Sequence, residues 1–270
     1  MEMSGPLLLI GCGKMGGALL SGWLGQGLKA ERVFIVEPAT AAVADFVAQG
    51  CRHLETPADL PEAPRLVMLA VKPQMMGDAL AGLTALAGPE TLFLSIAAGI
   101  KLESLSQALG AETKIVRAMP NTPAAVGRGM SVLVAGPGTT PDDRKLAEDL
   151  LATVGETAWV EEEGQLDAVT ALSGGGPAYV FLLAEVLAQA GVAAGLPEGL
   201  AARLARVTVA GSGELLHQAS EPPSVLRRNV TSPGGTTQEA LRVLMADDAL
   251  QPLVTRAIAA ATRRSRELGG

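Results

Sequence analysis

Short apolar runs alternate with amphipathic, helically spaced stretches through the first 160 residues of the chain. Runs of strand length lie at residues 7–10, 33–36, 66–71, 91–96, 114–118, 131–135 and 157–160. Helical stretches between them include residues 39–49, 74–86 and 142–154. Because this alternation is typical of parallel βαβ units, it predicts an α/β fold with an N-terminal Rossmann-like, doubly wound sheet.

The strand pattern stops after three glutamates at residues 161–163, and the rest of the chain has only helical spacing. Predicted helices cover residues 165–172, 178–190, 197–218 and 250–267, with one more that starts at Thr236. We therefore expect two domains, a dinucleotide-binding domain at residues 1–160 and a smaller all-helical domain at residues 161–270. The second is rich in Ala and Gly and poor in aromatic residues, which favours close helix packing, including packing between subunits.

A glycine fingerprint, GCGKMG, follows the first strand and opens a helix. Gly11 permits the tight turn, Gly13 lets backbone approach a pyrophosphate, and Gly16 lets helix and strand pack closely. The second strand ends at Glu37, whose carboxylate would accept hydrogen bonds from the adenine-ribose hydroxyls. The pattern predicts a dinucleotide site. The residues expected to line it are Gly11, Cys12, Gly13, Lys14, Met15, Gly16 and Glu37.

Three further loops follow predicted strands, where ligands of open α/β sheets bind. Lys72 would lie at the cofactor edge within reach of a phosphate, and Asn121 is held between prolines. Small residues close the strand at 91–96, as required where a nicotinamide or ribose approaches backbone. The predicted dinucleotide ligands on these loops are Ala70, Val71, Lys72, Pro73, Ala97, Ala98 and Asn121.

A polar, glycine-containing segment, NVTSPGGTT at residues 229–237, leads into a helix of the second domain. Thr236 and Glu239 have the spacing of a capping box, which predicts the helix start. A helix N-terminus behind a Gly-Gly turn presents free N–H groups and the positive end of a dipole. The segment therefore predicts a binding site for a carboxylate or a phosphate.

Composition and charge exclude several classes of protein. The net charge of −7 and the lack of a basic run argue against a nucleic-acid partner. Two cysteines give neither a metal-ligand spacing nor a disulfide framework, so we expect no metal. Residues 177–196 are nearly uncharged, but a helix that is apolar all round is better explained by burial in a core or a subunit interface than by a membrane. The opening residues lack a signal-peptide pattern, and we expect a cytoplasmic protein.

The helical domain lacks most of the basic side chains that could act as a catalytic base, which limits the reactions that it could support. Its range contains no lysine, since the last one is Lys145, and its only histidine is His217, late in a long helix. A hydroxyacid dehydrogenase of this architecture usually needs a Lys or His base. Reduction of a protonated C=N bond by a reduced nicotinamide needs only a hydroxyl near the nitrogen and a site for a carboxylate.

These motifs occur in the order and spacing of pyrroline-5-carboxylate reductases, which the chain resembles over essentially its whole length. The resemblance implies reduction of 1-pyrroline-5-carboxylate to L-proline, the last step of proline biosynthesis, by NADPH or NADH. It implies that Thr237 hydrogen-bonds the ring nitrogen and that Asn229 shapes the pocket. It also implies a homodimer through the helical domain, with a possible larger ring of dimers. The substrate-binding residues implied with them are Glu163, Ser232, Gly234, Gly235 and Thr236.

Two departures from the family pattern stand out. Residues 173–177 are SGGGP where the family commonly has SGSGP, so any contact of the missing hydroxyl is lost. Glu37 stands where many relatives have a small or basic residue, and residues 56–59 lack the asparagine that some use near the 2′-phosphate. Because a carboxylate repels a phosphate, we expect this chain to tolerate or prefer NADH.

Two other functions remain open at this point. A reductase of the same architecture could act on a different imine or on a β-hydroxyacid, and the missing lysine disfavours the hydroxyacid. A non-catalytic dinucleotide sensor would have no need of the polar cluster at residues 229–237.

Overall fold

A computed structural model describes residues 3–269 and divides the chain into two compact units. The first unit runs to Gly174 and includes the residues from Ala261 onward, and the second is Gly175–Ala260. The last helix, α11 (Leu250–Leu268), therefore contributes to both units. The functional division at residues 160 and 161 stays a prediction.

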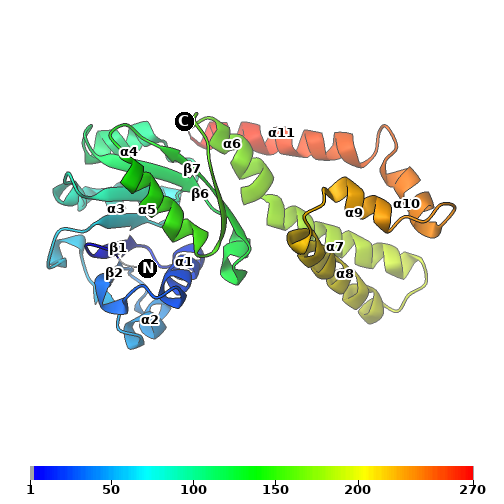
Figure 1. The fold of residues 1–270 in the computed structure, drawn as a ribbon, viewed down its shortest axis with the longest axis horizontal. Coiled ribbons are helices and arrows are strands. Elements are labelled where there is room, and N and C mark those ends of the chain that lie inside the picture. The colour runs from blue at the N-terminus through cyan, green and yellow to red at the C-terminus, as the bar shows by residue number, and fades with distance from the viewer. Residues whose placement is uncertain (1–2, 270) are drawn as a thin grey trace. The chain divides into compact units, whose positions relative to one another are not determined.

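An eight-stranded sheet forms the middle of the first unit, in the order β3-β2-β1-β4-β5-β6-β7-β8 (Figure 1). The strands are β1 (Leu7–Ile10), β2 (Val33–Val36), β3 (Arg52–Leu54), β4 (Leu66–Leu69), β5 (Leu92–Ser95), β6 (Lys114–Met119), β7 (Gly129–Ala135) and β8 (Gly155–Trp159). All neighbours pair in parallel except β6 and β7. This arrangement confirms the predicted Rossmann-like fold.

Helices cover both faces of this sheet, because alternate strand residues point to opposite sides. Leu7 and Leu9 of β1 pack with α1 (Lys14–Gly25) and α5 (Pro141–Ala152). Leu8 and Ile10 pack with α3 (Met76–Ala81) and α4 (Leu102–Leu109) on the other side. The remaining helical elements of the unit are α2 (Ala44–Ala48), α6 (Gln165–Val169), the π-helix η7 (Thr170–Gly174) and the 3-10 turns η1 (Ala30–Arg32), η2 (Thr40–Ala42), η3 (Pro57–Asp59), η4 (Pro73–Met75), η5 (Thr84–Leu86) and η6 (Thr122–Val126).

Three details of this unit differ from the sequence prediction. The short strand β3 contains arginine and histidine and has no apolar run to reveal it. Helix α4 was also not predicted. The pair β6–β7 is antiparallel because the connection at residues 120–128, which contains η6, is too short for a crossover between parallel strands.

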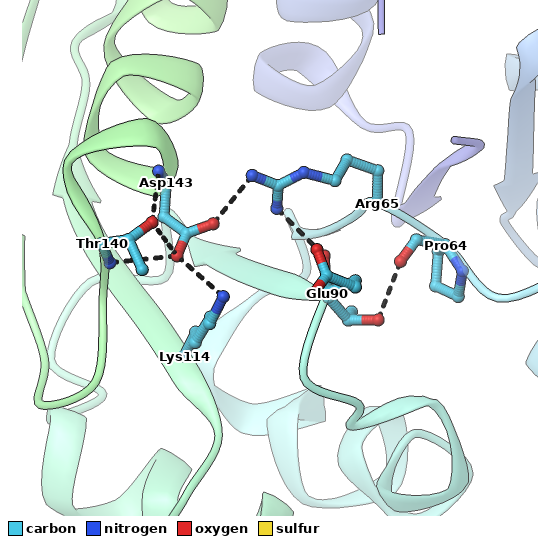
Figure 2. Close-up of polar contacts among 7 residues, drawn as sticks. Pro64, Arg65, Glu90, Lys114, Thr140 and Asp143 are labelled. Atoms are coloured by element: carbon cyan, nitrogen blue, oxygen red, sulfur yellow. Dashed lines mark hydrogen bonds and ion pairs between the residues drawn. The ribbon is translucent and has the colours of Figure 1, made fainter. Parts of the chain in front are cut away.

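A buried ionic cluster joins elements at the amino ends of the strands (Figure 2). The Asp143 side chain is fully buried, and its carboxylate accepts from Arg65 at 2.8 Å and lies 3.2 Å from Lys114 Nζ. It also accepts from the backbone N–H and hydroxyl of Thr140, which caps α5. Burial alone raises the pKa of Asp143, but the bonds from Thr140, Arg65 and Lys114 outweigh it and lower the pKa to about 2. The ion pairs of this Asp143 cluster therefore connect β4, β6 and α5.

The second unit contains four complete helices and the start of α11. These are α7 (Gly176–Ala193), α8 (Glu198–Gln218), α9 (Pro223–Asn229) and α10 (Thr236–Leu244). Helices α7 and α8 approach closely, since a Cβ at Gly191 would lie 3.2 Å from the Ala201 Cβ. Helix α9 was not predicted; it is short and begins at a proline pair.

The apolar helix α7 is exposed along most of its length rather than buried in the chain's own core. Of the two explanations offered for its composition, burial in the core is therefore wrong for a single chain. Among the described residues, one helical run, Gln165–Ala193, is long and apolar enough to cross a membrane by length and composition. The same test is passed by helices that are covered by protein, so this finding is weak support for a membrane span.

Candidate functional site

The glycine loop between β1 and α1 has the backbone shape that a dinucleotide requires. Gly11 has a positive φ of 89°, and its N–H donates to Val36 O at 2.9 Å. A Cβ at Gly16 would lie 2.5 Å from Gly11 O, so only glycine fits there. A Cβ at Gly13 would meet nothing within 4 Å, and α1 begins at Lys14 without a side-chain cap. Open space in front of an uncapped N-terminus of a twelve-residue helix fits a pyrophosphate.

Glu37 lies beside this loop, at the carboxyl end of β2. Its Oε2 accepts from Cys12 N at 2.8 Å and its Oε1 accepts from Ala39 N at 2.9 Å. The His53 Nε2 lies 2.9 Å from the Glu37 backbone O, which links β3 to the same corner. The carboxylate is therefore fixed by backbone N–H groups, with lone pairs left for ribose hydroxyls.

Cys12 is a packing residue of the loop. Burial, followed by the charge of Glu37 and the proximity of Cys51, raises the pKa of the Cys12 thiol to about 11. The thiol is therefore protonated at neutral pH, and a protonated thiol is neither a nucleophile nor a metal ligand.

The loop after β4 lies next to the glycine loop, since β4 is the neighbour of β1 in the sheet, and the loop after β5 follows along the same edge. Ala70 N donates to Ile10 O at 2.8 Å, and the Ala70 Cβ lies 3.3 Å from a Cβ built at Gly16. Val71 follows Ala70, and exposed Lys72 then precedes Pro73, the first residue of η4. In the next loop, Ala97 N donates to Ser95 Oγ at 3.4 Å, and Ala98 precedes Gly99. The predicted dinucleotide ligands of both loops thus share one edge.

The Asn121 side chain is bonded to protein groups. Its Nδ2 donates to Ser173 Oγ at 3.0 Å and to Ser173 O at 3.3 Å, and its Oδ1 accepts from Met130 N at 2.9 Å. Asn121 therefore ties the turn after β6 to β7 and to the π-helix η7. Its role as a dinucleotide ligand stays a prediction.

Glu163 is engaged within the first unit. Its Oε1 accepts from Leu102 N, at the start of α4, and from Arg117 of β6, each at 2.7 Å. The predicted role of Glu163 in substrate binding remains untested. Arg117 was not predicted from the sequence. Its position within an apolar strand was the available signal, because a buried charge requires a partner of opposite charge.

The second unit holds the predicted substrate residues at the start of α10. The helix is capped by Gly235, with Thr236 and Thr237 as its first two residues and without a side-chain cap. The predicted capping box of Thr236 and Glu239 is therefore wrong. The turn closes one residue earlier than predicted, because Gly235 N donates to Ser232 O at 3.0 Å and Gly234 has a positive φ of 69°.

Other residues complete this turn and leave two donors available. Gln238 Oε1 accepts from Gly234 N, and Glu239 pairs with Arg242 at 3.1 Å. Among the described residues, the N–H groups of Thr236 and Thr237 have no acceptor, and both residues are exposed. Asn229 is the last residue of α9 and Thr237 is the second residue of α10, so the stretch from Asn229 to Thr237 carries all the predicted substrate residues except Glu163.

A doubly wound sheet, a dinucleotide-shaped glycine loop and a helical C-terminal part define a nicotinamide-dependent oxidoreductase of the two-part type. The family model described as NADP oxidoreductase coenzyme F420-dependent matches residues 7–99. The model described as pyrroline-5-carboxylate reductase dimerisation matches residues 163–268.

Relatives along the full length identify the family. The pyrroline-5-carboxylate reductase of Pseudomonas aeruginosa is 38% identical over 268 residues, which cover 98% of each chain. The structure of the Coxiella burnetii pyrroline-5-carboxylate reductase has a TM-score of 0.93 at 32% identity and covers 99% of this chain and 100% of that one. The Plasmodium falciparum pyrroline carboxylate reductase structure with NADP bound has a TM-score of 0.82 at 30% identity and covers 99% of each chain. The chain belongs to the pyrroline-5-carboxylate reductase family.

Membership confirms several predictions from the sequence. The chain is an NAD(P)-dependent oxidoreductase, and its C-terminal part carries the family's dimerisation region, which indicates a homo-oligomer.

Proposed function

We propose that the chain reduces 1-pyrroline-5-carboxylate to L-proline with hydride from NADPH or NADH. The observation that carries the proposal is the presence of two anion sites in one family member. One is the glycine loop, open at Gly13. The other is the N-terminus of α10, where the N–H groups of Thr236 and Thr237 lack an acceptor among residues 3–269.

The dinucleotide ligands belong to the carboxyl edge of the sheet. The N–H groups at the start of α1 would bind the pyrophosphate, and Glu37 would accept from the adenine ribose. The loop after β2 would bind the adenosine end and the loop after β1 the pyrophosphate. The nicotinamide end would therefore lie near the loops after β4 and β5. The protein residues proposed to contact the nicotinamide end are Ala70, Val71, Lys72, Pro73, Ala97, Ala98 and Asn121.

The substrate carboxylate would be bound by backbone N–H groups of residues 234–237, helped by the dipole of α10. The Thr237 hydroxyl would accept a hydrogen bond from the protonated ring nitrogen, and Asn229 would shape the pocket. The bound nicotinamide supplies a hydride to the electrophilic imine carbon. The electron pair of the C=N bond then moves to nitrogen, which needs no strong protein base, because the iminium is already protonated.

The C-terminal part would serve two purposes, substrate binding and assembly. We propose that residues 161–270 form the functional substrate and dimerisation domain, and that dimers assemble through the exposed helices of this domain, possibly into a larger ring. The dimerisation match to residues 163–268 supports the dimer. The run Gln165–Ala193 lies entirely within that match, which favours an interface over a membrane span. We also propose a cytoplasmic location and no nucleic-acid partner, in keeping with the charge of −7.

Glu37 would influence the choice between the two dinucleotides. A carboxylate fixed by Cys12 N and Ala39 N cannot easily turn away from a 2′-phosphate. Like charges in a partly desolvated site repel each other, so we propose that this chain uses NADH well.

Loss of NAD(P)H absorbance with purified protein and racemic pyrroline-5-carboxylate tests the activity, with one run for each cofactor. Oxidation that yields proline supports the reductase. A folded protein that binds dinucleotide but oxidises neither cofactor would contradict it, and a panel of other cyclic imines and β-hydroxyacids would then separate a different reductase from a non-catalytic sensor.

A further inference from the structure

The turn after β5 is held at both ends by one pair of charged residues. The turn, residues 96–101, connects Ser95 at the end of β5 to Leu102 at the start of α4. Arg117 of β6 is the direct register partner of Ser95 in the sheet. Its guanidinium donates to Glu163 Oε1 at 2.7 Å, and the same oxygen accepts from Leu102 N at 2.7 Å. Arg117 and Glu163 thus connect the strand beside the turn's beginning to the residue at its end.

Glu163 supplies the cap that α4 does not carry in its own sequence. The N-cap of α4 is Lys101, which makes no side-chain cap bond, and a helix start leaves N–H groups without partners. A carboxylate at this position satisfies one N–H and interacts favourably with the helix dipole. Because Arg117 is buried and its charge is neutralised by Glu163, the carboxylate is fixed in place rather than free to swing into solvent.

A second contact reaches the middle of the same turn from the C-terminal end of the chain. Asp167 of α6 accepts from Ser265 Oγ of α11 at 2.7 Å. The end of α11 then lies against Gly99, where a Cβ would be 3.4 Å from Leu268 O. Figure 1 shows this end of α11 beside α6. Gly99 itself has a positive φ of 77°, a conformation that favours glycine.

From this geometry we infer that Arg117 and Glu163 are positioning residues that fix the turn at 96–101 for the nicotinamide end of the dinucleotide. The inference rests on the proposed function, which assigns Ala97 and Ala98 to that end. It gives Glu163 a role different from substrate binding. Glu163 touches neither reactant and acts through the backbone of the turn.

Dinucleotide binding tests the inference without turnover. Calorimetry with NADH and with ADP-ribose, which lacks the nicotinamide, separates the two ends of the ligand. For Glu163→Ala we expect about fivefold weaker NADH binding and ADP-ribose binding within about twofold of wild type, because the nicotinamide is the part of the dinucleotide that we assign to the turn. Glu163→Gln should show a smaller loss, since its amide oxygen can still accept from Leu102 N. Glu161→Ala, an exposed neighbour, is the matched control and should bind both ligands like wild type.

Kinetics on the same variants distinguish positioning from substrate binding. With pyrroline-5-carboxylate we expect kcat of Glu163→Ala to fall about tenfold while the KM for the imine changes less than about threefold, since a displaced nicotinamide loses alignment for hydride transfer. Arg117→Gln should act in the same direction, and the double variant should be no worse than the worse single one. A higher KM for the imine with unchanged NADH binding would make Glu163 a substrate ligand and overturn the inference. Equal losses for NADH and ADP-ribose, or no loss for either, would also overturn it. A wild type that binds NADH but reduces no imine would instead contradict the proposed function.

Discussion

The two units of the chain differ in how many of their apolar side chains they bury and in how their charged side chains are paired. The first unit buries large apolar residues on both faces of its sheet and pairs its buried charges internally, as at Asp143. In the second unit only Ala201 and Ala205 are buried among the described residues. Large apolar side chains of α7 and α8 remain exposed instead; examples are Phe181, Leu182, Val207 and Leu215.

This difference shows which part depends on other molecules. Burial of apolar area is the main favourable contribution to folding, so the second unit gains little of it as a single chain. It also leaves the N–H groups at the start of α10 open. The first unit buries its own apolar core, whereas the second leaves apolar surface exposed, in keeping with the match of residues 163–268 to a dimerisation region.

The largest expected effect comes from a charge placed on the exposed apolar surface of the second unit. Phe181 is 63% exposed in one chain, and we expect an interface to cover it. Phe181→Glu would bury a charge against apolar side chains, which costs several kcal/mol. We expect dissociation to monomers, measured by size-exclusion chromatography with light scattering, and a loss of helical circular dichroism.

Val47→Glu is the matched control, because Val47 is also exposed but lies on α2 of the first unit. It should leave the oligomer intact. If both variants keep the wild-type mass, the exposed surface of α7 is not the interface and the comparison between the units fails.

Thr237→Ala tests the open polar groups of the second unit. We expect kcat/KM for pyrroline-5-carboxylate to fall by about tenfold to a thousandfold, the range for one positioned hydrogen bond at a reacting centre. The Thr255→Ala control lies on α11, where the hydroxyl bonds to Gln251 O of its own helix at 2.9 Å. It should stay within about twofold of wild type. Activity of Thr237→Ala within the same limit would remove Thr237 from the mechanism.

Local patterns were sufficient to predict most of the first unit. The four residues of β1 are all buried and all apolar, and the glycines of the loop have the conformations that their spacing implies. The strand at residues 131–135 was predicted, but the antiparallel direction of β7 was not, because the direction depends on the length of the preceding connection rather than on the residues of the strand. Strand β3 pairs with only one neighbour and so lacks the apolar run of a central strand.

Long-range contacts explain what the sequence could not predict about the candidate site. Glu163 meets Arg117 and Leu102 across 46 and 61 residues of chain. Asn121 meets Ser173 across 52 residues. No periodicity connects positions so distant. The N-cap of α10 was predicted wrongly for a different reason. A Gly-Gly turn allows two N-cap positions, and the choice between them depends on the backbone conformation of Gly234 and Gly235.

Acid titration measures how much the Asp143 cluster of the first unit contributes to the free energy of unfolding. The folded pKa of Asp143, about 2, is below its usual value of 3.8. A lowered folded pKa means that the stabilisation is complete above pH 4 and is lost as the pH falls from about 4 to 2. The shift corresponds to about 2 kcal/mol. Urea unfolding of wild type and Asp143→Asn at pH 7 and pH 3 should show a difference that shrinks at the lower pH.

The exposed aspartate of the pair Lys145–Asp149 provides the control for this titration. Asp149→Asn should change the free energy of unfolding by less than about 1 kcal/mol, because surface ion pairs contribute little. A difference between wild type and Asp143→Asn that is the same at both pH values would show that the carboxylate charge does not stabilise the unit.

The smallest expected effect concerns Glu37, where the first unit fixes a charge internally and also presents it to a ligand. Glu37→Gln removes the charge and keeps one acceptor oxygen, for Cys12 N, while the bond from Ala39 N is lost. We expect the ratio of kcat/KM for NADPH to that for NADH to rise about fivefold, since one like-charge repulsion of about 1 kcal/mol is removed. Because ADP-ribose carries no 2′-phosphate, its binding should change far less than that of NADPH. If the ratio stays constant, Glu37 stabilises the loop without selecting the cofactor, and the internal bonds to Cys12 and Ala39 are its whole role.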